Sequence, residues 1–183
     1  TRRWLERTPT ADIGTVVLTG FEVPDEPLLS TLRGRGIPHL SAVLRDGAGV
    51  VGPWTPDALA PCPACAEAHR VDDDPARRVL ALQLAGRVGG APPETVAATV
   101  ATIMAQLAAP GPLRGAEVLV DPHGLRSGVR PLLPPPRCPV CAAGGRQRFH
   151  RRPAVAHEFH GVAGFLQRCA RQQGVDLVIL GDE

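Results

Sequence analysis

The hydrophobic and polar pattern of the first fifty residues predicts a strand, a helix and a second strand. An unbroken apolar run at residues 16–18 (VVL) is typical of a buried strand. Residues 23–36 follow with spaced leucines, which predict a helix that ends at Gly34 or Gly36. Residues 37–44 (IPHLSAVL) predict the next strand. This β-α-β order indicates a parallel sheet with a right-handed crossover.

The segment DGAGVVG at residues 46–52 has the glycine spacing of a dinucleotide-binding loop. Such a loop needs a helix directly after it, because the helix N-terminus holds the pyrophosphate. Here GPWTP follows at residues 52–56 and cannot open a helix in register, whereas Asp46-Gly47 favours a tight turn. The segment therefore predicts a β-hairpin, and the sequence offers no cofactor-binding loop.

Two helices are expected in the middle of the chain. Asp74 and Pro75 suit the N-cap and first position of a helix over residues 76–88, a better use for residues 72–74 (DDD) than a divalent-cation site. The clearest helix lies within residues 91–110. Its apolar stripe is formed by Val96, Val100, Ile103 and Leu107, which we expect in the core.

The second half of the chain predicts three further strands. Residues 116–121 (AEVLVD) and 126–133 (RSGVRPLL) predict an antiparallel pair across a turn at residues 122–124. From residue 144 the composition changes to a basic connector, followed by one helix and one apolar strand. We therefore divide the chain into an α/β domain, residues 1–143, and an extension, residues 144–183.

Charge and hydropathy exclude two classes of partner. All 20 basic residues are arginine, yet the formal net charge is only +2, which predicts no general affinity for nucleic acid. The basic stretch RQRFHRR at residues 146–152 contains a single aromatic residue, which argues against a nucleic-acid binder. No apolar run approaches the roughly 20 residues of a membrane helix, so no membrane partner is expected.

Four of the five cysteines fall into two C-x-x-C pairs, PCPAC at residues 61–65 and RCPVC at residues 137–141. Two such pairs supply the four thiolates of a closed tetrahedral site, which suits structural Zn²⁺. Free core cysteines and redox-active pairs are the alternatives. The short spacings and the absence of a visible secretion signal favour metal in a reducing compartment and a cytoplasmic protein. The predicted ligands are Cys62, Cys65, Cys138 and Cys141.

Other candidate residues carry weaker signals. His157 and His160 share a helix face, but the metalloprotease pattern HExxH is one residue longer. Cys169 lies in an apolar helical pattern without an identified base. No catalytic residue is therefore assigned.

The order of these motifs resembles the second half of the ThiF/MoeB-type adenylating proteins, the superfamily that includes ubiquitin-activating enzymes. The resemblance covers about residues 13–142, from LLSTLRGRGIPHLSAVLRDGAGVVGPW through PCPAC to LVDPHGLRSGVRPLL and RCPVC. It implies a partial Rossmann-like domain with a mixed sheet, a crossover helix and a structural zinc bound by the four cysteines.

A narrower resemblance concerns GVVGP followed by PCPACAEAHRVDDDPAR, with His69, Arg70, Asp74 and Pro75. These residues resemble the ThiF-like proteins of azole-forming peptide biosynthesis, which include thiopeptide pathways. The resemblance implies a non-catalytic scaffold that binds a precursor's leader peptide and partners a YcaO-type cyclodehydratase. A homodimer is a further expectation, because half a sheet leaves a strand edge and apolar surface to be covered.

The chain departs from the active members of the superfamily at three points. The glycine-rich ATP loop belongs to the first half, and residues 1–12 do not supply it. The acidic metal-and-ATP motif is replaced by TGFEVPDE, whose acids are Glu22, Asp25 and Glu26. No cysteine lies between Cys65 and Cys138 to act as the nucleophile. The alternative to the scaffold is an adenylating enzyme whose ATP site is completed by another segment or subunit.

Overall fold

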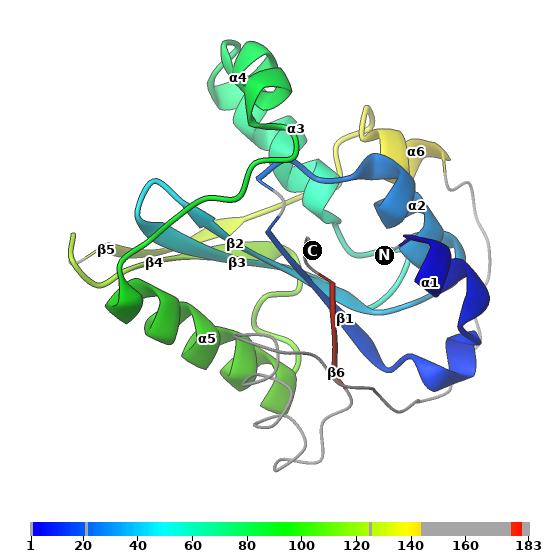
Figure 1. The fold of residues 1–183 in the computed structure, drawn as a ribbon. Helices are drawn as coiled ribbons and strands as arrows, with labels where there is room; N and C mark the ends of the chain where they lie inside the picture. The colour runs from blue at the N-terminus through cyan, green and yellow to red at the C-terminus, as the bar shows by residue number, and fades with distance from the viewer. Residues whose placement is uncertain (1, 21, 125, 144–176, 181–183) are drawn as a thin grey trace.

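The computed structural model of the chain describes residues 2–20, 22–124, 126–143 and 177–180. Within them a mixed sheet is flanked by helices on both faces (Figure 1). The elements are α1 (Arg2–Arg7), η1 (Thr10–Asp12), β1 (Thr15–Thr19), α2 (Glu26–Gly34), β2 (His39–Arg45), β3 (Ala48–Thr55), α3 (Pro63–Asp73), α4 (Arg77–Leu84), α5 (Pro93–Ala108), β4 (Ala116–Asp121), β5 (Arg126–Pro131), α6 (Pro139–Ala143) and β6 (Leu177–Leu180). The α/β class expected from the sequence is confirmed.

The sheet has six strands in the order β5-β4-β3-β2-β1-β6. β1 pairs in parallel with β2 and with β6, whereas the β2–β3, β3–β4 and β4–β5 pairs are antiparallel. The predicted β1-α2-β2 unit and the predicted β4–β5 pair are both present. The partner of β6, which the sequence left open, is the outer edge of β1. β6 therefore covers an edge that we expected to be free.

Alternating side chains of β1 divide the core between the two faces of the sheet. Val16 and Leu18 belong to a cluster with leucines of α2 and with three of the cysteines. Val17 faces the opposite cluster, which includes Ile103 and Leu107 of α5. In Figure 1, α5 lies below the sheet, and α2, α3 and α6 lie above it. The cysteines are thus part of one half of the hydrophobic core.

The segment with dinucleotide-loop spacing forms a hairpin, as predicted. Asp46 and Gly47 both have positive φ angles, 50° and 81°, which form the tight turn between β2 and β3. Gly52 lies within β3 at φ 114°, and a Cβ there would come within 2.5 Å of the Ala116 carbonyl oxygen. Gly47 therefore serves the turn, and Gly52 allows the close approach of β3 to β4.

Two helices differ from the prediction in length or orientation. α4 begins at Arg77 and ends at Leu84, shorter than the expected 76–88, because Ala85 leaves the helical conformation at ψ 127°. The Asp74 carboxylate still accepts a hydrogen bond near the helix start, from Ala76 N at 2.9 Å. α5 is rotated relative to the predicted stripe: Thr95 and Thr99 are buried, while Val96 and Val100 are only half-buried.

Among the described helices, none combines the length and the apolar character that a membrane crossing requires. His157, His160 and Cys169, together with the helix predicted before β6, lie outside the described residues.

Candidate functional site: a four-cysteine cluster

The first C-x-x-C pair lies at the start of α3, a helix that the sequence did not predict. Cys62 is the N-cap, and its carbonyl oxygen accepts hydrogen bonds from the backbone N–H groups of Cys65 at 2.8 Å and Ala66 at 3.3 Å. Pro63 occupies the first helical position, where its missing N–H has no intrahelical partner to lose. This first turn brings the Sγ atoms of Cys62 and Cys65 to 3.8 Å from each other.

The second pair lies at the start of α6, a helix of five residues. Cys138 N donates to the carbonyl oxygen of Pro135 at 3.0 Å, and Ala142 N donates to that of Cys138 at 2.8 Å. The backbone N–H of Cys141 points at the Cys138 Sγ, 3.4 Å away. Because α6 packs against α2 and α3, this turn delivers both sulfurs to the first pair.

The four sulfurs form a compact cluster. The Sγ–Sγ distances are 3.7 Å for Cys62–Cys138, 3.5 Å for Cys62–Cys141 and 3.3 Å for Cys65–Cys141. All four sulfurs lie within 4.8 Å of one another. Four thiolates around Zn²⁺ at about 2.3 Å would be about 3.8 Å apart in a tetrahedron. The observed cluster is therefore compatible with a metal site of this kind.

Burial and mutual hydrogen bonding control the ionisation of these thiols. Cys62, Cys65 and Cys138 are buried, and Cys141 is half-buried. Hydrogen bonding to Cys138 raises the pKa of the Cys62 and Cys65 thiols, whereas hydrogen bonding to Cys141 lowers the pKa of Cys138. Four thiolates at these distances would repel one another without a cation between them. A metal ion removes this penalty because coordination deprotonates the thiols.

A closed set of four sulfur ligands leaves no position for substrate or water. The cluster can hold α3, α6 and the loop before α6 together, but it cannot perform metal-assisted chemistry without losing a ligand. Of the predicted site residues, all four cysteines are thus brought together, as the C-x-x-C spacings predicted.

A second polar cluster, which the sequence analysis missed, lies under α3. Glu22, just after β1, forms ion pairs with Arg45 of β2 at 2.5 Å and Arg77 of α4 at 3.3 Å. Arg77 also binds Glu67 of α3 through two contacts, at 2.8 Å and 3.1 Å. Glu22 and Arg77 are both buried. No local motif identifies this network, because its members come from three separate elements and the loop after β1.

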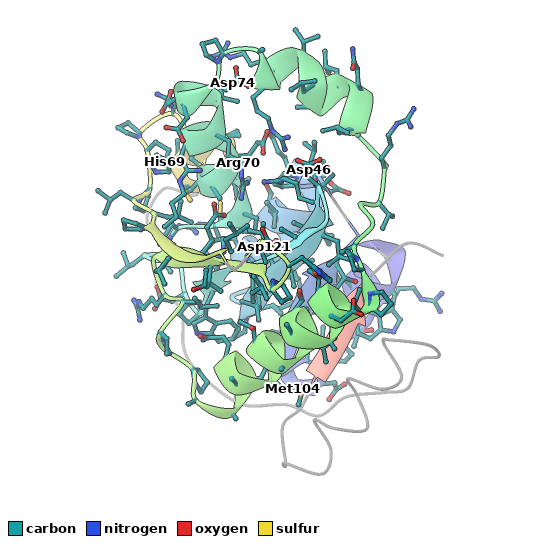
Figure 2. All side chains as sticks on the ribbon, turned by 90° about the vertical axis from the view of Figure 1, so that its left-hand side faces the viewer. Asp46, His69, Arg70, Asp74, Met104 and Asp121 are labelled. Carbon is teal, nitrogen blue, oxygen red and sulfur yellow. The ribbon has the colours of Figure 1, made fainter. Side chains whose placement is uncertain are left out.

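Arg70 extends the network to the sheet. It forms an ion pair with Glu117 of β4 and lies 3.5 Å from Glu67. Burial lowers the pKa of Arg70, and the negative charge of Glu117 opposes this shift. In Figure 2, Arg70 on α3 and Met104 on α5 lie on opposite sides of the sheet. The neighbouring His69 has its Nε2 atom 2.8 Å from the Leu133 carbonyl oxygen. Both residues therefore connect α3 to the β4–β5 side of the sheet.

Two small hollows flank this network among the described residues. One has about 270 Å³ of empty space and is lined by Glu22, Ser41, Arg45 and Arg70, among others. The other has about 280 Å³ and is lined mainly by Leu18, Pro24 and the first turns of α2. Both volumes include space open to solvent, and both lie below the roughly 300–1,000 Å³ of typical ligand pockets.

No protein-family model matches this sequence, and no curated protein matches it. Solved structures do match. E. coli MccB aligns with a TM-score of 0.51 at 17% identity, over 83% of this chain and 44% of MccB. MccB with AMPCPP and selenomethionine MccA aligns with a TM-score of 0.51 at 14% identity, over 77% and 43%. A heterocyclase in complex with substrate and cofactor aligns with a TM-score of 0.45 at 14% identity, over 76% and 27%.

This chain spans less than half the length of MccB. At identities of 14–17%, the likeness to MccB establishes the fold. The α/β fold with a mixed sheet, which the sequence resemblance implied, is thus shared with MccB, and the four cysteines are grouped in it as expected.

Proposed function

We propose that this chain is a non-catalytic, ThiF-like scaffold in ribosomal peptide biosynthesis, which binds a precursor's leader peptide and partners a YcaO-type cyclodehydratase. The observation that carries the non-catalytic role is the engagement of the acids after β1. Glu22 is held by Arg45 and Arg77, and the Asp25 carboxylate caps α2 by accepting from Leu28 N at 3.1 Å. Glu22 is also buried, so its carboxylate would have to leave these partners to reach a Mg²⁺–triphosphate complex, whereas Asp25 is exposed and uses one oxygen for the cap.

The choice of pathway rests on the sequence resemblance around residues 61–77. Several residues of that stretch have structural roles in the fold: Cys62 and Cys65 contribute to the cluster, Arg70 binds Glu117, and Asp74 precedes α4. These roles agree with a protein that uses this fold for binding. The partner, the leader peptide and a cytoplasmic location are part of the proposal.

We assign structural Zn²⁺ to Cys62, Cys65, Cys138 and Cys141. The donor set supports this choice, because four clustered cysteine sulfurs are a typical ligand set of structural zinc sites. The ion would cross-link α3 to α6 and would take no part in catalysis.

A second candidate is an ATP-dependent adenylating enzyme of the ThiF/MoeB type, completed by another segment or subunit. The specific observation in its favour is the shared fold with MccB, which has been solved with AMPCPP and MccA. In this candidate, Glu22 and Asp25 would leave their present partners to bind the metal of the nucleotide.

Isotope exchange between ATP and pyrophosphate separates the two candidates. We expect the purified chain, with Mg²⁺ and a precursor peptide, to exchange no label above a protein-free background. Exchange that disappears in both Glu22→Gln and Asp25→Asn would assign the activity to this chain and contradict the scaffold proposal. Exchange that survives in both variants would indicate a contaminating enzyme, so the variants serve as the control.

A further inference from the structure

α4 exposes most of its large apolar residues to solvent, whereas Arg77, at its start, is buried. The helix Arg77–Leu84 has the sequence RRVLALQL, and its one buried residue is Arg77. Leu82 is 81% exposed, Val79 60% and Leu80 42%. In Figure 1, α4 projects from the end of α3, away from the sheet. This distribution is the reverse of that of a helix packed on its own domain.

The position of α4 is nevertheless fixed. The Arg77 guanidinium makes a two-point contact with Glu67 of α3 and a third contact with Glu22 after β1. These contacts raise the pKa of Arg77, mainly through the hydrogen bond to Glu67, and keep it charged. The Asp74 carboxylate holds the turn before the helix. Because the base of α4 is held in this way, its apolar side chains are presented in a defined direction.

The helix surface has its own charge pattern. α4 contains no acidic residue, and Arg78 forms no ion pair among the described residues. Arg87, just beyond the helix, uses its Nε to donate to the Gln83 carbonyl oxygen and has no carboxylate partner in the described part of the chain. The aspartates before α4 are occupied, since Asp72 pairs with Arg137 and Asp73 with Arg130. α4 therefore presents an apolar surface flanked by arginines that have no carboxylate partner among the described residues. A partner surface that complements it is apolar and flanked by acidic residues.

We propose that α4 inserts into an apolar groove with an acidic rim on another protein. Val79 and Leu82 lie on one side of the helix, and Leu80 and Leu84 lie on another, so a groove that contacts the helix from two sides would cover them all. A second copy of α4 would cover only one side, over a helix of about 12 Å, too little for a stable dimer of about 800 Å² per partner.

The inference rests on the proposed function, under which the groove lies on the cyclodehydratase. The probe is the purified YcaO-type cyclodehydratase of the same pathway, titrated with this chain in a calorimetric or optical binding assay. The test variants are Leu82→Glu, Val79→Glu and Arg78→Glu. The matched control is Leu59→Glu, which places the same charge at an apolar residue that is 84% exposed and far from α4 in sequence.

We expect Leu82→Glu and Val79→Glu to weaken binding at least tenfold, because each buries a carboxylate in an apolar groove. Arg78→Glu should weaken binding severalfold, and more at low salt than at high salt. Leu59→Glu should bind like the unaltered chain. Each variant should keep its zinc content and melting temperature, since the replaced side chains are exposed.

Four results would overturn the inference, and they are distinguishable. If the unaltered chain does not bind the cyclodehydratase, the proposed function fails together with the inference. If it binds and the α4 variants bind equally well, the proposed function stands and α4 is not the docking element. If the unaltered chain is a dimer by light scattering and Leu82→Glu is a monomer, a second copy covers α4. If residues 144–176 cover α4 instead, their deletion would make the amide hydrogens of α4 exchange faster. This result would also contradict docking to a partner.

Discussion

The Sγ atoms of Cys62 and Cys138 lie 3.7 Å apart, although 76 positions separate these residues along the chain. The contact joins the start of α3 to the start of α6 inside the core that also contains Val16 and Leu29. Closing a loop of this length costs chain entropy, which grows slowly with loop length. A metal ion at this point would therefore stabilise the half of the domain that lies above the sheet.

The first prediction concerns this cluster. Purified protein should contain one equivalent of zinc by elemental analysis, and Cys138→Ser should lower the zinc content and the Tm. A loss of several kcal/mol would lower the Tm by about 10 °C, since 1 kcal/mol corresponds to roughly 3 °C for a chain of this size. Cys169→Ser is the control, because Cys169 is not among the four clustered cysteines, and it should keep its zinc. If wild-type protein contains no zinc and the Cys138→Ser variant has the same Tm as wild type, the zinc assignment is refuted.

The second prediction concerns pH. Burial lowers the pKa of His39 from 6.5 to about 4, with a smaller contribution of the same sign from Arg33. The folded state therefore binds fewer protons than the unfolded state between these values, and stability falls as pH drops from 6.5 towards 4. Above pH 6.5 His39 has no such effect, and below pH 4 the penalty is constant at about 3 kcal/mol.

Denaturant unfolding of wild type and His39→Gln at several pH values measures this effect. The difference in free energy of unfolding between the two proteins should move in favour of the variant as pH drops from 6.5 to 4. Taking the difference removes the contribution of zinc release, which both proteins share. A difference that is constant over this range would show that His39 is not the cause.

The third prediction concerns the hairpin. Gly52→Ala should destabilise the protein by about 2–3 kcal/mol, because the residue has φ 114° and its Cβ would meet the backbone of β4 within 2.5 Å. Gly34→Ala, where a Cβ would meet nothing within 4 Å, should change stability little. Equal Tm values for the two variants would show that β3 and β4 do not approach as closely as the structure indicates.

The sequence predicted the elements whose patterns are local. The apolar run at residues 16–18, the Asp46-Gly47 turn and the proline-bounded α5 each carry their signal within a few residues, and each was found as expected. The C-x-x-C spacings likewise predicted the cysteine cluster, because two such pairs supply the four thiolates of a single metal site.

The elements that were missed depend on contacts between distant residues. α3 has no apolar periodicity beyond its first turn, since Glu67 and Arg70 face a polar network instead of a hydrophobic core. α6 is only five residues long, too short for a helical period to be visible. On α5, Thr99 is buried against Gly49. Its hydroxyl donates a hydrogen bond to the Thr95 carbonyl oxygen at 2.7 Å, so this polar group can be buried without a partner outside its own helix.

We propose above that this chain assists a cyclodehydratase and catalyses nothing itself. The most direct test is the rate of azoline formation by the YcaO protein, measured with and without this chain, on precursor peptide that carries or lacks its leader. We expect the chain to raise the rate at least tenfold on the leader-bearing peptide and to have little effect on the leaderless one. A rate that is independent of the chain on both peptides would contradict the proposed function.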